Sequence, residues 1–236
     1  MAKIDKRQHS KSEWHSIRAQ RRQEKIIKRQ TDLSEVDLQI DKTKTIFVVG
    51  NGTSRKSVDL TVLKKYGKVY GCNALYREFD PDILVAVDTK MVLELNKAKY
   101  QHRVPVWTNP NKSYSGMTGF NFFNPSKGWS SGPTALWKAS EDSAEEIYIL
   151  GFDYKGLGDN YDKVNNVYAG THNYKKEHER ATFYGNWLKQ TAITIQKNPQ
   201  TRYIRVIEDR GFVPKELTNL SNLTHMSIED FKNFFK

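Results

Sequence analysis

The chain has 236 residues, a single cysteine and a formal net charge of +11, with 38 Lys and Arg against 27 Asp and Glu. This length can bury a substantial core, and a lone Cys72 excludes a fold built on disulfides. No apolar run reaches membrane-spanning length and the N-terminus has no signal-peptide pattern, so the sequence predicts an intracellular, cytoplasmic protein without membrane partners.

The positive charge is concentrated at the start of the chain. Residues 1–30 contain ten Lys and Arg against three Asp and Glu, so seven of the eleven net charges lie there. Good helix formers with a loose apolar set predict that residues 1–44 form a basic arm, helical or partly disordered. The arm could bind nucleic acid through its phosphates, and a solvated lead-in is the alternative.

From residue 45 onward, apolar runs alternate with helical patterns. Ile46–Val49 is typical of a strand buried on both faces, and "RKSVDLTVLKKYG" after it predicts a short helix that stops at Gly67. In chain order we then expect strands at 68–73, 80–88 and 104–109, a surface loop or short β excursion at 111–129, a helix at 130–141, a strand at 145–153, a helix at 175–190, a strand at 203–209 and a helix at 227–235.

Two of these helices have recognisable start signals. Pro133 suits a first helical turn, with Ser131 or Gly132 near the cap. Ser227 suits an N-cap because an acidic first turn follows it, where negative charge interacts favourably with the helix dipole.

The first predicted strand runs into a loop of the sequence "GNGTS". Gly50 and Gly52 permit backbone conformations that are closed to other residues, and unpaired amides in such a loop can bind an anion. The loop has neither the Walker lysine spacing nor a full dinucleotide fingerprint. Alone it fits a phosphate loop and an ordinary turn about equally.

Alternating strands and helices predict an α/β fold, with a mostly parallel Rossmann-like sheet and helices on both faces. We expect residues 45–236 to form a single nucleotide-binding domain of this kind. In such sheets ligands bind beyond the carboxyl ends of the strands. The polar residues predicted to lie together along that edge are Asn51, Asn73, Asp88, Asn109 and Asp153.

Three segments in order, "VVGNGTS", "VYGCNALY" and "SSGPTALWKASEDSAEEIYILGFDY", resemble motifs of the Rossmann-like bacterial sialyltransferases. The resemblance covers roughly residues 45–185 and extends to the related group that includes the archaeal hydroxymethylpterin diphosphokinase; it would suit a phage-encoded member. In the sialyltransferases these motifs surround the cytidine nucleotide of the sugar donor. The nucleotide contacts that the resemblance implies are Asn51, Gly52, Ser54, Asn73, Ser130, Ser131, Gly132, Asp153 and Tyr154.

The resemblance also implies a lid at about 155–175, rich in glycine and asparagine. Tyr161 and Tyr168 would hold the leaving phosphate, and His172 would be the general base, since imidazole titrates near neutral pH. His178, on the predicted helix 175–190, is a rival for that role. A plain surface position for His172 and a bracing role for Asp153 are the alternatives.

These observations predict a glycosyltransferase that moves a sugar from a CMP- or UDP-type nucleotide sugar to an acceptor hydroxyl, on modified DNA or a glycan. No cofactor is required for this reaction. One alternative is an ATP-dependent diphosphokinase-like enzyme, with Mg²⁺ held by Asp88 and Asp153. Another is a non-catalytic nucleic-acid-binding or structural protein on the same fold. The sequence leaves the oligomeric state open.

Overall fold

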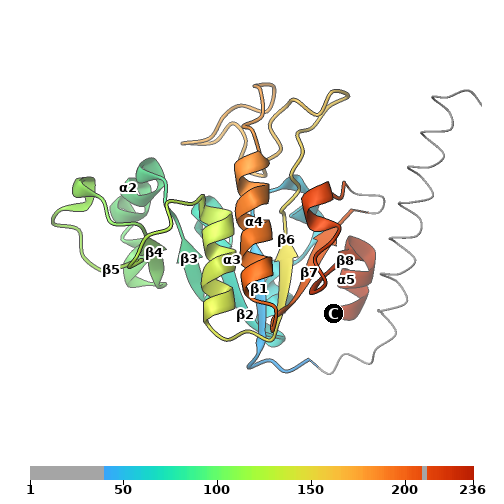
Figure 1. Cartoon of the computed structure of the whole chain (residues 1–236). Coiled ribbons are helices and arrows are strands. Elements are labelled where there is room, and N and C mark those ends of the chain that lie inside the picture. The colour runs from blue at the N-terminus through green and yellow to red at the C-terminus, as the bar shows by residue number, and fades with distance from the viewer. Residues whose placement is uncertain (1–39, 209–211) are drawn as a thin grey trace, which may run out of the picture. The chain divides into compact units, whose positions relative to one another are not determined.

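The computed structural model describes residues 40–208 and 212–236, so most of the predicted basic arm lies outside the described residues. The described part contains one sheet of eight strands in the order β5-β4-β3-β2-β1-β6-β7-β8, and every neighbouring pair is parallel (Figure 1). The α/β, Rossmann-like prediction is confirmed. The strands are β1 (Thr45–Val49), β2 (Lys68–Cys72), β3 (Ile83–Val85), β4 (Val106–Thr108), β5 (Phe120–Phe122), β6 (Glu146–Leu150), β7 (Arg202–Ile207) and β8 (Leu223–Ser227).

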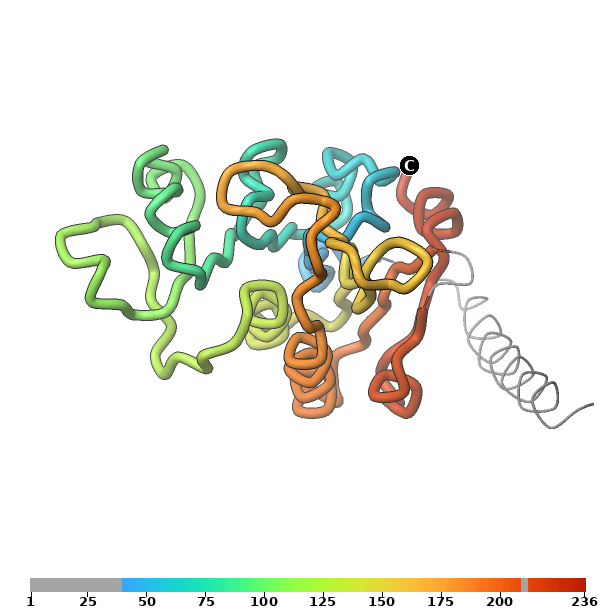
Figure 2. The backbone as a smooth tube through the Cα atoms, turned by 90° about the horizontal axis from the view of Figure 1, so that it is seen from above, coloured from blue at the N-terminus to red at the C-terminus, as the bar shows by residue number. Residues whose placement is uncertain are grey.

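Helices cover both faces of this sheet. Figure 2 shows α3 and α4 on one side and α2, α5 and the 3-10 helices that follow β1 and β2 on the other; the α-helices are α2 (Thr89–Lys97), α3 (Ser131–Glu141), α4 (Gly185–Lys197) and α5 (Ile228–Phe234). A hydrophobic core lies on each face of the sheet, and β1 contributes to both. Phe47 and Val49 face one helical layer, while Ile46 and Val48 face the other. Among the described residues, no helix combines the length and apolar character needed to cross a bilayer.

The starts of α3 and α5 agree with the sequence, whereas α2 was not predicted. Ser227 is the N-cap of α5, and its hydroxyl accepts a hydrogen bond from the Asp230 backbone N–H at 3.0 Å, as predicted. α3 begins at Ser131 with Ser130 as its N-cap, one residue before the predicted cap, and Pro133 lies in its first turn. The edge strand β8, which covers residues 223–227, was not predicted.

Two predicted helices are wrong in detail. The segment after β1 forms two 3-10 helices, Thr53–Ser57 and Leu60–Lys65, because Asp59 is extended and its carboxylate caps the second one through Thr61. The predicted helix at 175–190 starts only at Gly185. The chain before it is held by an antiparallel bridge between Arg180 and Lys163, so His178 lies in a turn and not on a helix.

The loops that follow β1 and β6 are in direct backbone contact. The Gly50 N–H donates to the Leu150 carbonyl at 2.8 Å, and the Gly52 N–H donates to the Gly151 carbonyl at 2.9 Å. A Cβ atom on Gly50 would lie 2.7 Å from the Gly151 carbonyl oxygen, and Gly151 itself has a φ of +67°. The glycines are therefore required by the approach of the neighbouring loop, and not by the approach of a phosphate, as the sequence had suggested.

We predict that Gly50→Ala destabilises the protein by about 1–3 kcal/mol, because the new methyl group overlaps backbone that has little freedom to move. Gly132→Ala is the matched control, since its Cβ would meet only the Phe152 ring, at 3.3 Å. Urea unfolding measures both variants. Equal stability of Gly50→Ala and the wild type would show that the loop contact is not a constraint.

Candidate functional site

A pocket of about 510 Å³ opens where the carboxyl ends of β1, β2, β3 and β6 meet the start of α3. The site lies beside the point at which the strand order reverses, between β1 and β6, which is where ligands bind in open α/β sheets. We call residues 155–184, which cross above this edge of the sheet in Figures 1 and 2, the strap. The strap and the first turn of α4 complete the pocket wall. Its volume suits a small-molecule ligand.

Most of the predicted nucleotide contacts line this one pocket. They are Asn51, Gly52, Asn73, Ser130, Ser131, Gly132, Asp153 and Tyr154. Ser54 is buried outside the lining. Of the other polar strand-end residues, Asp88 lines the pocket, but Asn109 does not, because β4 lies three strands away from β1.

The amides of Gly52, Thr53 and Ser54 in the loop after β1 are already paired, contrary to prediction. The Thr53 N–H donates to Asn165 Oδ1 at 2.9 Å, and the Ser54 N–H donates to Asp153 Oδ2 at 3.2 Å. The Ser54 hydroxyl donates to the other Asp153 oxygen. The carboxylate of Asp153 thus takes the place, at a 3-10 helix N-terminus, that the sequence suggested for a phosphate. It braces the loop, which was the alternative role for this residue.

The N-terminus of α3 offers an anion site instead. Within residues 40–208 and 212–236 no side chain caps it, and Pro133 has no N–H, so the amides of Ser131 and Gly132 remain as its first-turn donors at the pocket wall. The Ser131 hydroxyl oxygen accepts a hydrogen bond from the Val87 N–H at 3.0 Å. The backbone of Ser130 is fixed by Gln190 of α4, at 3.1 Å. Backbone donors and the helix dipole therefore favour negative charge here.

Two side-chain amide oxygens of pocket residues accept no hydrogen bond from a described residue. Asn51 donates its Nδ2 to the Tyr174 hydroxyl at 3.3 Å, and its Oδ1 is buried without a partner among the described residues. Asn73 Oδ1 is in the same condition, and Asn73 has a φ of +52°, which asparagine tolerates. A buried acceptor without a donor is costly, so a ligand with N–H or O–H groups would be stabilised there. Tyr174, which orients Asn51, had no sequence signal.

The backbone of the loop after β6 is held in place by hydrogen bonds from a buried arginine. Arg205 is only 2% exposed and donates to the carbonyl oxygens of Phe152, Asp153 and Phe212 at 2.8, 3.2 and 3.0 Å. Burial lowers the pKa of its guanidinium, although the nearby Asp153 carboxylate partly offsets this. Arg205 therefore positions the pocket wall that carries Asp153 and Tyr154.

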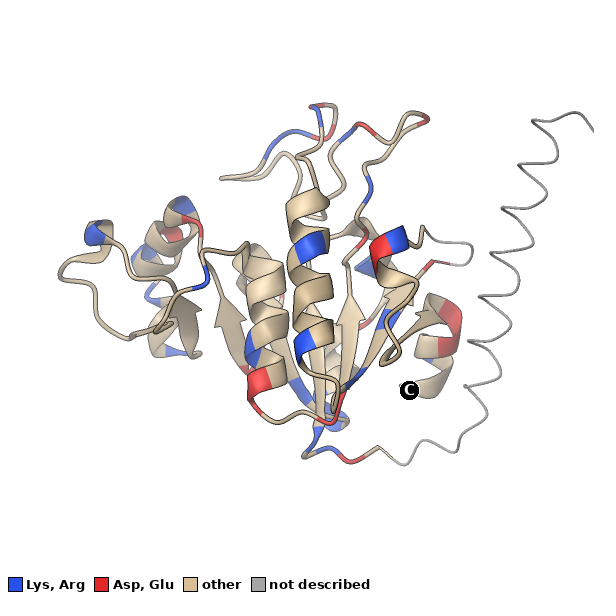
Figure 3. Cartoon of the chain, in the orientation of Figure 1, with Lys and Arg blue, Asp and Glu red and all other residues tan. Residues whose placement is uncertain are grey.

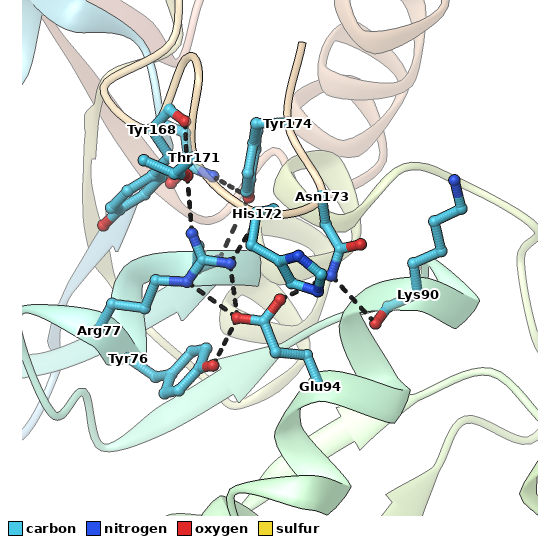
Figure 4. Close-up of polar contacts among 11 residues, drawn as sticks. Tyr76, Arg77, Lys90, Glu94, Tyr168, Thr171, His172, Asn173 and Tyr174 are labelled. Atoms are coloured by element: carbon cyan, nitrogen blue, oxygen red, sulfur yellow. Dashed lines mark hydrogen bonds and ion pairs between the residues drawn. The ribbon is translucent and has the colours of Figure 1, made fainter. Parts of the chain in front are cut away.

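The strap is attached to the body by polar contacts, drawn in Figure 4. Arg77 donates to the Thr171 hydroxyl at 2.8 Å and to the His172 carbonyl at 2.9 Å. Glu94 of α2 accepts from Arg77 at 2.5 Å and from Asn173 Nδ2 at 2.6 Å. On the other side, the Val167 N–H donates to the Asn51 carbonyl at 2.8 Å. The strap thus connects the loop after β1 with α2.

None of the three predicted catalytic residues lines the pocket. Tyr168, which belongs to the strap, is buried, and its hydroxyl donates to Glu78 and accepts from Arg55. Tyr161 is 63% exposed. His172 borders a shallow depression over α2, because its carbonyl is bound by Arg77.

Comparison of the chain with protein-family models, with curated proteins and with solved structures found no match. The resemblance to sialyltransferases therefore stays a prediction.

Glu94→Gln is expected to loosen the strap. Burial opposes ionisation of Glu94, but hydrogen bonds from Tyr76, Arg77 and Asn173 outweigh it and lower the pKa of its carboxyl. A lowered pKa in the folded state contributes stability above the unfolded pKa, about 4.3, that is lost as the pH falls through the folded value. Hydrogen exchange at residues 165–175 should therefore be faster in Glu94→Gln at neutral pH.

The control is Glu145→Gln, which removes an exposed ion pair with Lys44 outside the pocket lining. It should leave exchange in the strap unchanged. Equal exchange in wild type and Glu94→Gln would mean that the contacts in Figure 4 do not hold the strap.

Proposed function

We propose that the protein is an enzyme that transfers a glycosyl group from a nucleotide-sugar donor to an acceptor hydroxyl. One observation carries the proposal: the N-terminus of α3, which no described side chain caps, lines the same pocket as two asparagines whose amide oxygens accept no hydrogen bond from a described residue. The ligand that fits has a negative group at one end and N–H or O–H donors at the other. A nucleoside phosphate has both.

The leaving phosphate would lie at the N-terminus of α3. The amides of Ser131 and Gly132 would stabilise the charge that develops as the bond to the sugar breaks. Lys155 and Lys175 of the strap line the same pocket and add positive charge. The ribose hydroxyls, common to CMP- and UDP-type donors, would donate to Asn51 and Asn73.

The strap suits group transfer because it covers an activated donor and keeps water away from it. Both oxygens of Asp153 already accept a hydrogen bond from Ser54, so binding of Mg²⁺ between Asp88 and Asp153, which pyrophosphoryl transfer from ATP would use, would compete with these contacts. This arrangement favours glycosyl transfer over the diphosphokinase alternative.

The acceptor is a glycan or a modified nucleic acid. Figure 3 shows Lys and Arg interspersed with Asp and Glu along the strap, so this segment carries charges of both signs. An acceptor bound through its phosphates would rely on residues 1–30, which lie outside the described residues.

A thermal-shift panel of CMP, UDP, GDP and ATP, with and without Mg²⁺, tests the proposal. At a hundredfold excess over Kd, the fitting nucleotide should raise the Tm by about 5–10 °C without added metal. Its sugar conjugates are then assayed for transfer. Stabilisation by ATP only in the presence of Mg²⁺ would indicate pyrophosphoryl transfer, and no shift with any nucleotide would indicate a non-catalytic protein.

Ser130→Asp tests the anion site itself. A carboxylate at the N-cap should accept from the first-turn amides, raising stability by about 0.5–2 kcal/mol while lowering nucleotide affinity at least tenfold by occupying the phosphate position. Ser130→Asn is the control, because it caps the helix without adding charge. Unchanged affinity in Ser130→Asp would remove the phosphate from this position.

A further inference from the structure

Asp88 is the one pocket carboxylate with both oxygens unengaged within residues 40–208 and 212–236. It follows β3 and is the N-cap of α2, but its side chain does not cap that helix. It forms no ion pair with a described residue. Asp153, the other acidic residue of the lining, is bound by Ser54 through both oxygens. Asp88 is therefore free to interact with a ligand.

Asp88 is an exposed residue at the pocket, and partial desolvation of its carboxyl by the protein raises its pKa. This direction makes it a stronger base than an ordinary aspartate. The titratable groups that face it are Cys72 at the end of β2 and Tyr174 of the strap. Both are neutral at pH 7, because burial raises the pKa of Cys72 to about 12 and also raises that of Tyr174.

The remaining charged groups of the pocket are Asp153, Lys155 and Lys175. None of them contributes to the pKa shift of Asp88. Opposite Asp88, the hydroxyl of Ser131 in α3 is already engaged by Val87, the residue before Asp88. This bond connects the proposed base to the start of the helix where the phosphate would lie.

We propose that Asp88 is the general base of the transfer reaction, an inference that rests on the proposed function. The acceptor oxygen forms a bond to the anomeric carbon and gives its proton to the Asp88 carboxylate. The bond between that carbon and the phosphate oxygen breaks, and its electron pair leaves with the nucleotide. Asp88 then returns the proton to solvent. His172, which lies outside the pocket, has no part in this step.

The test is Asp88→Asn, assayed with the nucleotide sugar that the thermal-shift panel selects. Asparagine is as good an N-cap as aspartate, so α2 should be retained, and the Tm checks this. We expect kcat to fall about 10²–10⁴-fold, the range for loss of a general base, with the nucleotide Kd within about threefold of wild type. His172→Ala is the matched control and should keep wild-type kcat.

The pH profile gives a second readout that a structural role would not change. In the wild type, kcat should fall on the acid side with an apparent pKa above that of an ordinary aspartate, and Asp88→Asn should lose this dependence. A kcat within about fivefold of wild type in Asp88→Asn would overturn the assignment and leave the proposed function standing, whether or not His172→Ala is active. Absence of turnover in the wild type with every nucleotide sugar would overturn both.

Discussion

Backbone contact between the loops after β1 and β6 is the constraint on which the rest of this site depends. Gly50 and Gly151 approach so closely that neither position has room for a side chain without a shift of the opposing backbone. This approach brings the Asp153 carboxylate to the amide and hydroxyl of Ser54. Once those groups are satisfied, the loop after β1 is a structural element, and the free helix terminus of the pocket is that of α3.

Different elements of the site are therefore suited to different parts of a ligand. Backbone amides at the start of α3 are suited to negative charge, the side chains of Asn51 and Asn73 to hydrogen-bond donors, and Asp88 to a proton. The strap connects these parts, because it is bonded both to the loop after β1 and to Glu94 of α2. Binding and release of a ligand would thus depend on how firmly those bonds hold.

The local sequence pattern was enough to predict much of the architecture. Buried apolar runs mark β1 and β6, Ser227 marks the start of α5, and the rule that polar strand ends converge placed Asn51 and Asn73 in one pocket. The pairing of the loop amides could not be predicted in this way. Their acceptors, on Asp153 and Asn165, lie 99 and 112 residues further along the chain, and only the tertiary fold brings them there. The same holds for the strap, whose bonds to Arg77 hold the backbone of His172 away from the pocket.

The most direct test of the account is a map of backbone amide shifts in the ¹⁵N-labelled protein on adding the selected nucleoside monophosphate, compared with its nucleoside. We predict shifts at Ser131 and Gly132 that appear with the monophosphate and not with the nucleoside, and no such difference at Thr53 and Ser54. Phosphate-dependent shifts at Thr53 and Ser54, with Ser131 and Gly132 unaffected, would contradict the assignment of the anion to α3.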